Sequence, residues 1–409
     1  MSSTKFPLTG ISSVALHSAG HNNADHAHLT PIYATSTFTF DSAQQGMERF
    51  AGEDKTKLYS RWGNPSFTAA EKTIEALEAF GLKGENGEAL KLKALLHSSG
   101  QAAMTTLFMS NLKAGEAVLS HFSLYGGTHE LFLKVLSEAG INTILVDFRD
   151  LNQVEDALKN NKTIKLVHIE TPANPTINCV DIAAITGLAK ANGLLVSVDN
   201  TFATPYLQQP FKFGVDFVCH STTKFLNGHG TSIGGVLLGK DLELMNGKVW
   251  KWHVLLGGNS NPFDAFLLSN GMKTLELRMD RHCSNAFTVA NYLNEHAAIA
   301  HVNYAGLTTH PDYAVAAKQM KHPGALMSFE VKGGIEAGIK FIDKLQVCVK
   351  AISLGTVDTL VSHPASMSHK GLSKEEREKY GITDGLIRFS TGIENIADLL
   401  TDLEQALHI

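Results

Sequence analysis

Short apolar runs alternate with amphipathic segments over residues 65–250, and this alternation constrains the fold more than any other feature of the chain. Between two of the runs, Ile182, Ile185 and Leu188 form an apolar stripe with helical spacing that stops before Gly193. Strands that alternate with helices predict an α/β fold with a mostly parallel sheet covered by helices. The runs that we predict to be buried strands are 94–97, 117–119, 143–146, 166–169, 194–198 and 236–238.

The pattern changes after about residue 264. A long amphipathic helix is expected over 275–292, and strands are expected at 325–329 and 386–389. A closing helix follows Asn395, which we expect to be its N-cap. We therefore predict an N-terminal arm over residues 1–60, a large domain over 61–264 and a smaller C-terminal α+β domain over 265–409.

The composition is that of a soluble globular protein. The chain has 409 residues, of which 44% are hydrophobic and 18% charged, and it is long enough for two cores. A net charge of -5 gives no electrostatic reason to expect a nucleic acid or an anionic membrane as a partner. No stretch approaches the roughly 20 apolar residues of a membrane span, and the first residues lack the apolar stretch of a signal peptide.

The four cysteines are widely spaced and form no pair with metal-ligand spacing. This distribution predicts buried thiols in a reducing compartment, and we expect a cytoplasmic protein. Four histidines lie close together in the N-terminal arm, at His17, His21, His26 and His28. They could bind a metal, but no cysteine or acidic pair completes a ligand set, so a solvated arm is the better interpretation and no metal site is predicted.

Lys224 is the residue that most constrains the chemistry. It closes a segment in which an apolar run is followed by Ser221, Thr222 and Thr223, and Asp199 closes another apolar run upstream. An amine that can form a Schiff base and an acid that can pair with a pyridinium nitrogen are what pyridoxal 5'-phosphate (PLP) requires from a protein. The alternatives are a solvated surface lysine and an aspartate that caps the following helix.

A phosphate site is expected at Ser99, Gly100 and Gln101, which follow one predicted strand and open a helix. Backbone N–H groups at a helix N-terminus can bind an anion, and the hydroxyl groups of Ser221 and Thr223 would add donors. Ligands of parallel sheets lie beyond the carboxyl ends of the strands. This loop and the upstream acid at the end of its strand are therefore expected at one site.

Ordered motifs extend over nearly the whole chain. They are YSRWGNP at 59–65, SSGQAA at 98–103, YGGT at 125–128, ETPANP at 170–175, DNT at 199–201, STTK at 221–224, SLG at 353–355, HPASM at 363–367 and GLIR at 385–388. With these motifs the chain resembles the Cys/Met-metabolism family of PLP enzymes, the γ-family of fold type I. That family includes cystathionine γ-synthase, cystathionine γ-lyase, methionine γ-lyase and the O-acylhomoserine sulfhydrylases.

The resemblance implies a role for each matching residue. Lys224 would bind the cofactor and move protons, and Asp199 would keep the pyridine nitrogen protonated. Tyr125 would stack on the ring and could act as an acid toward the departing group, although a core tyrosine is the alternative. Asn174 would bind the phenolic oxygen of the cofactor.

Two further pairs follow from the same resemblance. Arg388 and Ser353 would bind the substrate carboxylate, for which a guanidinium is better suited than an amine. Tyr59 and Arg61 would reach the phosphate of the neighbouring subunit, so that a homodimer shares its active sites and two dimers form a tetramer. An ordinary exposed arginine is the alternative for Arg61.

The reaction is the least constrained part of the prediction. Gly127, where methionine γ-lyases generally have cysteine, together with Gln101 and the segment 228–235, favours γ-replacement on an O-acylhomoserine by sulfide or a thiol. That reaction is the one of O-acetylhomoserine sulfhydrylase or cystathionine γ-synthase. The alternative is γ-elimination to 2-oxobutyrate, ammonia and a thiol, as in methionine γ-lyase or cystathionine γ-lyase. A non-catalytic PLP-binding protein is a remote alternative, because it would need neither Arg388 nor Tyr125.

Overall fold

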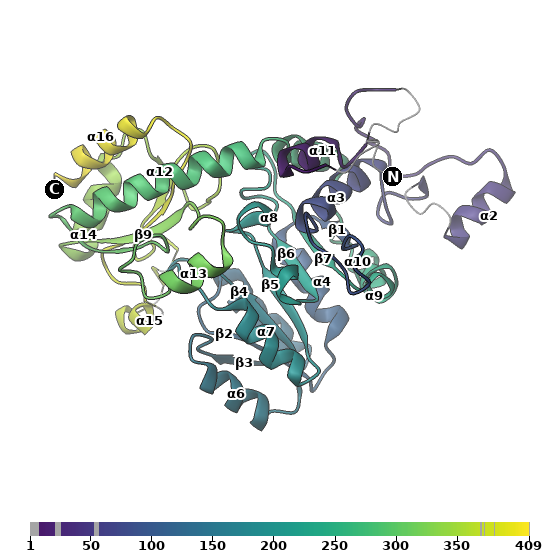
Figure 1. Cartoon of the computed structure of the whole chain (residues 1–409), viewed down its shortest axis with the longest axis horizontal. Coiled ribbons are helices and arrows are strands. Elements are labelled where there is room, and N and C mark those ends of the chain that lie inside the picture. The colour runs from purple at the N-terminus through teal and green to yellow at the C-terminus, as the bar shows by residue number, and fades with distance from the viewer. Residues whose placement is uncertain are drawn as a thin grey trace.

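Two β-sheets organise the molecule in the computed structural model, which describes residues 8–20, 26–52, 57–368, 370–371, 373–379 and 381–408. A seven-stranded sheet lies in the larger part of the molecule, and a five-stranded sheet lies towards the C-terminus (Figure 1). The long helix α12 (Leu275–Glu295) runs between the two parts. Within the described ranges, no helix is long and apolar enough to cross a membrane.

The large sheet has the strand order β1-β7-β6-β5-β4-β2-β3. Strands β3, β2, β4, β5 and β6 run parallel to one another, whereas β7 runs antiparallel to both β6 and β1. The predicted mostly parallel sheet is therefore confirmed. Its strands are β1 (Lys93–His97), β2 (Ala117–His121), β3 (Asn142–Val146), β4 (Ile164–Glu170), β5 (Leu195–Asp199), β6 (Phe217–His220) and β7 (Gly235–Gly239).

Helices cover both faces of this sheet because neighbouring strand residues are buried on opposite sides. Leu96 and Val167 belong to the apolar core on one face, while Leu95 and Leu166 belong to the core on the other. The predicted helix after β4 is α7, and Gly193, with φ of +68°, follows its end. The helices of this part are α3 (Pro65–Glu78), α4 (Gly100–Asn111), α5 (Gly126–Glu130), α6 (Leu151–Asn160), α7 (Ile182–Ala191), α8 (Thr204–Leu207), α9 (Leu242–Leu244), α10 (Trp250–Leu256) and α11 (Pro262–Met272).

The small sheet has the order β10-β11-β12-β9-β8 and forms its own apolar core with α12, α14 and α16. The predicted closing helix is confirmed, and Asn395 caps it because its Oδ1 accepts a hydrogen bond of 3.0 Å from the Ala397 N–H. The elements are β8 (Ile299–Asn303), α13 (Tyr313–Gln319), β9 (Leu326–Val331), α14 (Gly334–Lys344), β10 (Val349–Lys350), β11 (Leu360–Ser362), α15 (Lys374–Lys379), β12 (Leu386–Ser390) and α16 (Ile396–Leu407).

Helix α12 connects the two sheets through side-chain hydrogen bonds. Arg278 donates to the backbone carbonyls of Phe225 and Leu226, next to Lys224 in the chain. Further along the same helix, Nδ1 of His282 lies 2.6 Å from the carbonyl oxygen of Thr391, which directly follows β12. The helix therefore contacts the turn after β6 and the end of β12 at once.

The N-terminal arm contains two short helices that the sequence analysis did not predict, α1 (Ile11–His17) and α2 (Ala43–Ala51). Helix α2 lies on an extension that stands away from the rest of the molecule (Figure 1). Both helices are short, so few residues carry a periodic signal. The domain boundaries at residues 60 and 264 stay a prediction.

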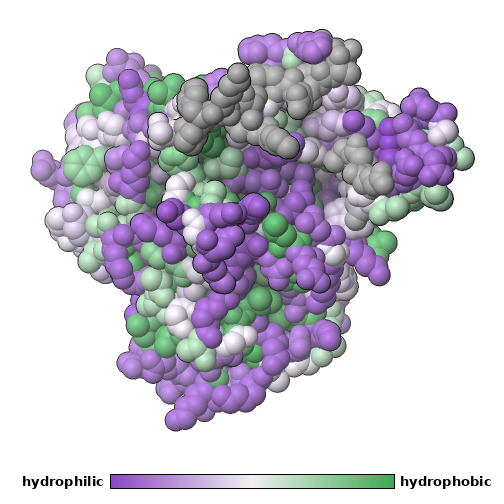
Figure 2. Space-filling view, turned by 45° about the vertical axis from the view of Figure 1, so that its right-hand side comes forward, coloured by the Kyte–Doolittle hydropathy of each residue, from purple (hydrophilic) through white to green (hydrophobic). Residues whose placement is uncertain are grey.

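All four cysteines are buried and free. Hydrophilic residues cover much of the face shown in Figure 2, with apolar patches between them. Of the four histidines in the arm, His21 lies outside the described residues. Within the described part of the chain, no group of three or more His, Cys, Asp or Glu side chains is arranged to hold a metal ion.

Candidate active site

A cavity of about 1190 Å³ lies at the carboxyl ends of β4, β5 and β6. It is the place where an α/β sheet is expected to bind its ligand. The predicted site residues that line it are Gly100, Gln101, Tyr125, Asn174, Asp199, Ser221, Thr223, Lys224, Ser353 and Arg388. The cavity thus brings together residues that are distant in the sequence.

The predicted phosphate loop has the local structure of an anion site. Ser99 is the N-cap of α4, and its Oγ accepts a hydrogen bond of 3.1 Å from the Ala102 N–H. A Cβ atom added to Gly100 would lie 3.0 Å from Cβ of Ser221. A side chain at this position would fill the space beside the serine, so the glycine keeps the backbone N–H groups of the helix start open to a ligand.

Asp199 ends β5 and is held by Thr201. Its Oδ1 accepts a hydrogen bond of 3.0 Å from the Thr201 N–H and one of 2.5 Å from the Thr201 hydroxyl group. The same hydroxyl oxygen accepts a hydrogen bond of 2.8 Å from the Ser221 N–H. Burial raises the pKa of Asp199, whereas Thr201 and His220 lower it. A cation in the cavity would compensate for the burial of this acid.

Lys224 points at the small sheet across the cavity. Its Nζ donates a hydrogen bond of 3.0 Å to Oγ of Ser353. Burial, and to a smaller extent the nearby charge of Arg388, lowers the pKa of Lys224 to about 8. A substantial fraction of this amine is therefore neutral near physiological pH, which is what a base or nucleophile requires.

Arg388 on β12 lies with its Nη2 2.7 Å from the carbonyl oxygen of Ile352 and 2.8 Å from that of Ser353. The side chain is only 9% exposed, and its buried Nε has no hydrogen-bond partner among the described residues. No carboxylate of the chain pairs with it in the described part. An N–H group of a buried guanidinium is thus left for an anion in the cavity.

Glu170 is a site residue that the sequence analysis did not single out. Its Oε2 accepts a hydrogen bond of 2.8 Å from the Tyr125 N–H, and its Oε1 accepts one of 3.4 Å from the Asn174 N–H. Burial and the neighbouring Asp199 raise the pKa of Glu170 to about 8. The signal was present in the sequence, because Glu170 closes an apolar run in the same way as Asp199 does.

A second missed feature lies beneath the cavity. Nε2 of His220 lies 2.7 Å from Oε1 of Glu78, and both side chains are fully buried. The same carboxylate oxygen accepts a hydrogen bond of 3.2 Å from Nδ2 of Asn200. Asn200 directly follows Asp199, and His220 directly precedes Ser221. Both contact Glu78, so they tie the ends of β5 and β6 to α3.

Tyr59 and Arg61 do not line the cavity of their own chain. Nη1 of Arg61 donates a hydrogen bond of 2.9 Å to the carbonyl oxygen of Val254, and its guanidinium lies 5.5 Å from the centre of the Tyr59 ring. Tyr59 is 44% exposed. These two residues therefore sit on a surface away from the ligand cavity of the same chain.

Comparison with known proteins identifies the chemistry of this cavity. The model of the family described as "Cys/Met metabolism PLP-dependent enzyme" matches residues 12–408. This chain belongs to that family. It is therefore a PLP-dependent enzyme of fold type I that acts in trans-sulfuration chemistry.

Individual relatives of this PLP enzyme are similar over almost their full length. L-methionine gamma-lyase from Fusobacterium nucleatum subsp. nucleatum is 44% identical over 98% of both chains, and the one from Porphyromonas gingivalis is 44% identical over 98% of this chain and 97% of the relative. The structure of cystathionine gamma synthase from Xanthomonas oryzae pv. oryzae, in complex with cystathionine, matches with a TM-score of 0.89. It is 37% identical over 98% of both chains.

The cavity fits PLP on its own geometry. The open start of α4 beside Ser221 suits the phosphate, and the buried Asp199 suits a protonated ring nitrogen. The unpartnered Nε of Arg388 suits the carboxylate of an amino acid. These features lie in one cavity with the amine of Lys224, as a Schiff-base enzyme requires.

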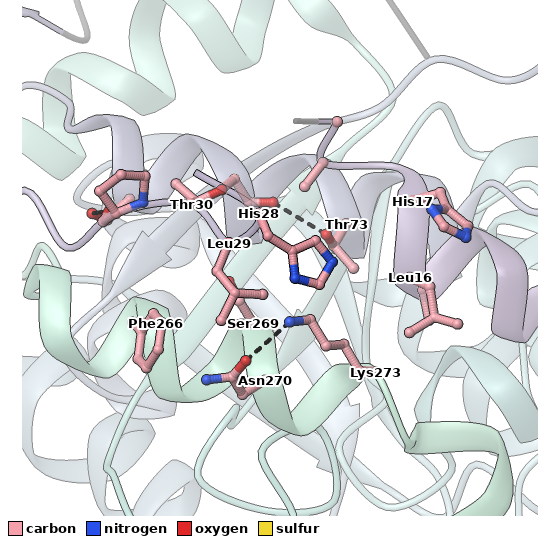
Figure 3. Close-up of a pocket in the computed structure, with 16 residues that line it drawn as sticks. Leu16, His17, His28, Leu29, Thr30, Thr73, Phe266, Ser269, Asn270 and Lys273 are labelled. Atoms are coloured by element: carbon pink, nitrogen blue, oxygen red, sulfur yellow. Dashed lines mark hydrogen bonds between the residues drawn. The ribbon is translucent and has the colours of Figure 1, made fainter. Parts of the chain in front are cut away.

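A second, smaller hollow of about 190 Å³ lies between α1, α3 and α11. Lys273 and His28 point into it, and Nζ of Lys273 donates a hydrogen bond of 3.1 Å to Oδ1 of Asn270 (Figure 3). Ten of the predicted site residues line the large cavity, whereas none lines this hollow.

Proposed function

We propose that this PLP enzyme catalyses γ-elimination on a small amino acid with a thioether at its γ-carbon, with L-methionine as the first substrate to test. In that reaction methionine and water give 2-oxobutyrate, ammonia and methanethiol. The near full-length similarity to L-methionine gamma-lyases is the observation that carries the proposal. The sequence motifs alone favoured γ-replacement over γ-elimination, whereas the similarity to these relatives favours γ-elimination.

The wall of the cavity beside Ser353 supports a thioether substrate. The lining there includes the apolar side chains of Val349, Ile352 and Leu360, together with Thr356 and Asp358. Ile352 is 74% exposed and directly precedes Ser353. An apolar wall favours a methylthio group over a second charged amino-acid head, because burying a charge against such a surface is unfavourable.

The cofactor roles proposed here follow the geometry of the cavity. Gly100 and Gln101 would bind the phosphate through the start of α4, together with the hydroxyl groups of Ser221 and Thr223. Asp199 would pair with the ring nitrogen. Tyr125, Asn174 and Glu170 lie around the same part of the cavity.

The substrate would be held by its carboxylate and processed by the lysine. PLP, when bound, supplies an electron sink that makes the protons at Cα and Cβ of the amino acid acidic. Arg388 would bind the carboxylate through its free Nε, with the Ser353 hydroxyl group beside it. Lys224 would then take a proton at Cα and return it elsewhere, because its lowered pKa lets it exist in both charge states near pH 8.

We further propose that the active sites are shared in a homodimer, and that two dimers form a tetramer. Tyr59 and Arg61 would reach the phosphate of the neighbouring subunit, which agrees with their absence from the cavity of their own chain. The arm also carries exposed apolar side chains, Met47 at 61% and Phe50 at 63%, which a partner could cover. The four buried free thiols support the proposed cytoplasmic location.

A second candidate function is γ-replacement on an O-acylhomoserine, and Gly127 favours it. A Cβ atom at this position would lie 2.6 Å from Cε1 of Tyr125 and 3.2 Å from Nε2 of Gln101. A cysteine, as expected for methionine γ-lyases, would therefore require the tyrosine ring to move. The Tyr125 side chain of this protein accordingly occupies the space next to Gly127 that a side chain at this position would need.

A product assay on the purified holoenzyme separates the two functions. With L-methionine alone, γ-elimination predicts 2-oxobutyrate and methanethiol at a rate that does not depend on added sulfide. With O-acetyl-L-homoserine and sulfide, γ-replacement predicts homocysteine in excess of 2-oxobutyrate. Sulfide-dependent homocysteine without any 2-oxobutyrate from methionine would make the enzyme a γ-replacement enzyme and our first choice wrong.

A further inference from the structure

We propose that Glu170 is a positioning residue for the cofactor ring, because its carboxyl group holds Tyr125 and Asn174 in place beside Asp199. This role is independent of whether the enzyme eliminates or replaces the γ-substituent. It rests on the position of Glu170 in the sheet, on its two hydrogen bonds and on its burial.

Glu170 and Asp199 are neighbours in the sheet. Glu170 is the last residue of β4, Asp199 is the last residue of β5, and the two are paired in the register of these parallel strands. Side chains of paired residues on adjacent parallel strands point to the same face, and both residues line the cavity. Glu170 is 5% exposed. Two acids thus lie side by side in the ligand site, Glu170 buried and Asp199 half-buried.

The carboxyl group of Glu170 joins two segments that contact the ligand site from different directions. Tyr125 lies at the start of α5, after β2, and its N–H donates to Oε2 at 2.8 Å. Asn174 lies in the loop after β4, and its N–H donates to Oε1 at 3.4 Å. The Glu170 side chain therefore sets the distance between Tyr125, the proposed partner of the ring face, and Asn174, the proposed partner of the phenolic oxygen.

The N–H groups of Tyr125 and Asn174 need two acceptor oxygens at this place, and a carboxyl group provides both. A carboxyl group can accept a hydrogen bond at each oxygen, whereas the glutamine amide has one acceptor and would place its NH₂ group against a backbone N–H. Burying a second acid beside Asp199 is unfavourable, and it raises the pKa of Glu170 to about 8. The two backbone N–H groups that Glu170 satisfies offset part of that penalty.

The test compares the Glu170→Gln holoenzyme and its apoprotein with the native protein. Loss of one hydrogen bond and the new N–H repulsion should raise the dissociation constant of PLP about tenfold or more. A displaced Tyr125 should also change the visible circular dichroism of the bound cofactor, which reports how the ring is held. At saturating PLP the KM for the amino acid should stay within about twofold, because Glu170 does not contact the proposed carboxylate site.

The matched control is Asp402→Asn in the C-terminal part of the chain. Asp402 is also a buried carboxylate that accepts backbone N–H bonds, from Gln346, Val347 and Cys348, and it lies outside the cavity. It should lower the melting temperature without changing the PLP dissociation constant or the visible circular dichroism. Glu170→Asp, which keeps the carboxyl group but shortens the reach, serves where the glutamine variant does not fold, and it should show the same two changes. A variant at 170 that loses stability but keeps native PLP affinity and native visible circular dichroism would overturn the proposal.

Discussion

Lys224 and Ser353 meet across the cavity with 3.0 Å between Nζ and Oγ. The lysine follows β6 of the large sheet, and the serine belongs to the segment before β11 of the small sheet. The hydrogen bond therefore joins the proposed base to the segment whose backbone carbonyls also hold Arg388. The residues proposed for proton transfer and for carboxylate binding therefore both contact the backbone or side chain around Ser353.

Replacing Lys224 by alanine should abolish both cofactor attachment and turnover. Among the residues that line the cavity it is the one lysine, so no neighbour can supply the Schiff base. We expect kcat to fall by at least about a thousandfold, in line with the loss of a general base. Absorption spectroscopy of the purified variant checks the attachment, and normal turnover would contradict the assignment.

The rate at which the apoprotein captures PLP should rise with pH, with a midpoint near pH 8, and level off above about pH 9. Attack on the cofactor aldehyde requires the neutral amine, and burial together with Arg388 lowers the pKa of Lys224 to about 8. A lowered lysine pKa means that the neutral form becomes abundant as pH rises through that value. Arg388→Met should move the midpoint to higher pH, whereas Arg149→Met, far from the lysine in an ion pair with Asp147, should not. Stopped-flow absorbance over pH 6–10 measures both midpoints.

Arg61→Ala and Lys224→Ala proteins should each be nearly inactive but regain activity when they are co-assembled. If the arginine serves the neighbouring subunit, one site of each mixed dimer keeps both residues. Random mixing then predicts recovery to about a quarter of native activity, since half of the dimers are mixed and each has one intact site. Refolding each variant alone is the control. No recovery in the mixture would mean that the phosphate site does not cross the interface.

Gly127→Cys should displace Tyr125 and lower kcat/KM about tenfold, because the added Cβ would lie 2.6 Å from Cε1 of that ring. Gly126→Cys is the matched control, since a Cβ at Gly126 meets no atom within 4 Å. The ratio of 2-oxobutyrate to homocysteine in the two variants tests whether the missing side chain favours replacement. If the tyrosine ring moves but the product ratio stays unchanged, Gly127 does not favour replacement over elimination.

Ile352→Glu should shift substrate preference from methionine towards cystathionine. A carboxylate in this wall would pair with the distal ammonium group of cystathionine, whereas a methylthio group would desolvate the carboxylate without pairing with it. We expect the ratio of the two kcat/KM values to change by about tenfold or more, and Ile352→Gln to change it less. Steady-state kinetics on both substrates decide this, and equal ratios in both variants would show that the wall does not select the substrate.

Much of the fold could be predicted from the sequence because its buried strands are apolar runs of the right length. The parallel core and α7 followed from periodicity and from Gly193. Helices α1 and α2 did not, because each is too short for a clear period. The antiparallel direction of β7 depends on how the chain returns to the sheet, which no local pattern records.

The cavity residues were predictable where a motif carried them. Lys224 and Arg388 were found in this way, and the structure brings them to one cavity. The contact between Glu170 and Tyr125 was not predictable, because it depends on the register of β4 and on the start of α5. The sequence showed only that Gly127 is not a cysteine. The structure adds that the Tyr125 ring lies where a side chain at this position would be.

Helix α12 contacts both the turn after Lys224 and the end of β12. We therefore expect it to keep a constant distance between Lys224 and Arg388, the proposed partners of the substrate's amine and carboxylate. An amino acid whose amine and carboxylate are attached to the same carbon matches one such distance. A β-amino acid, with one more carbon between the two groups, would reach only one of these partners at a time and should be rejected whatever its side chain.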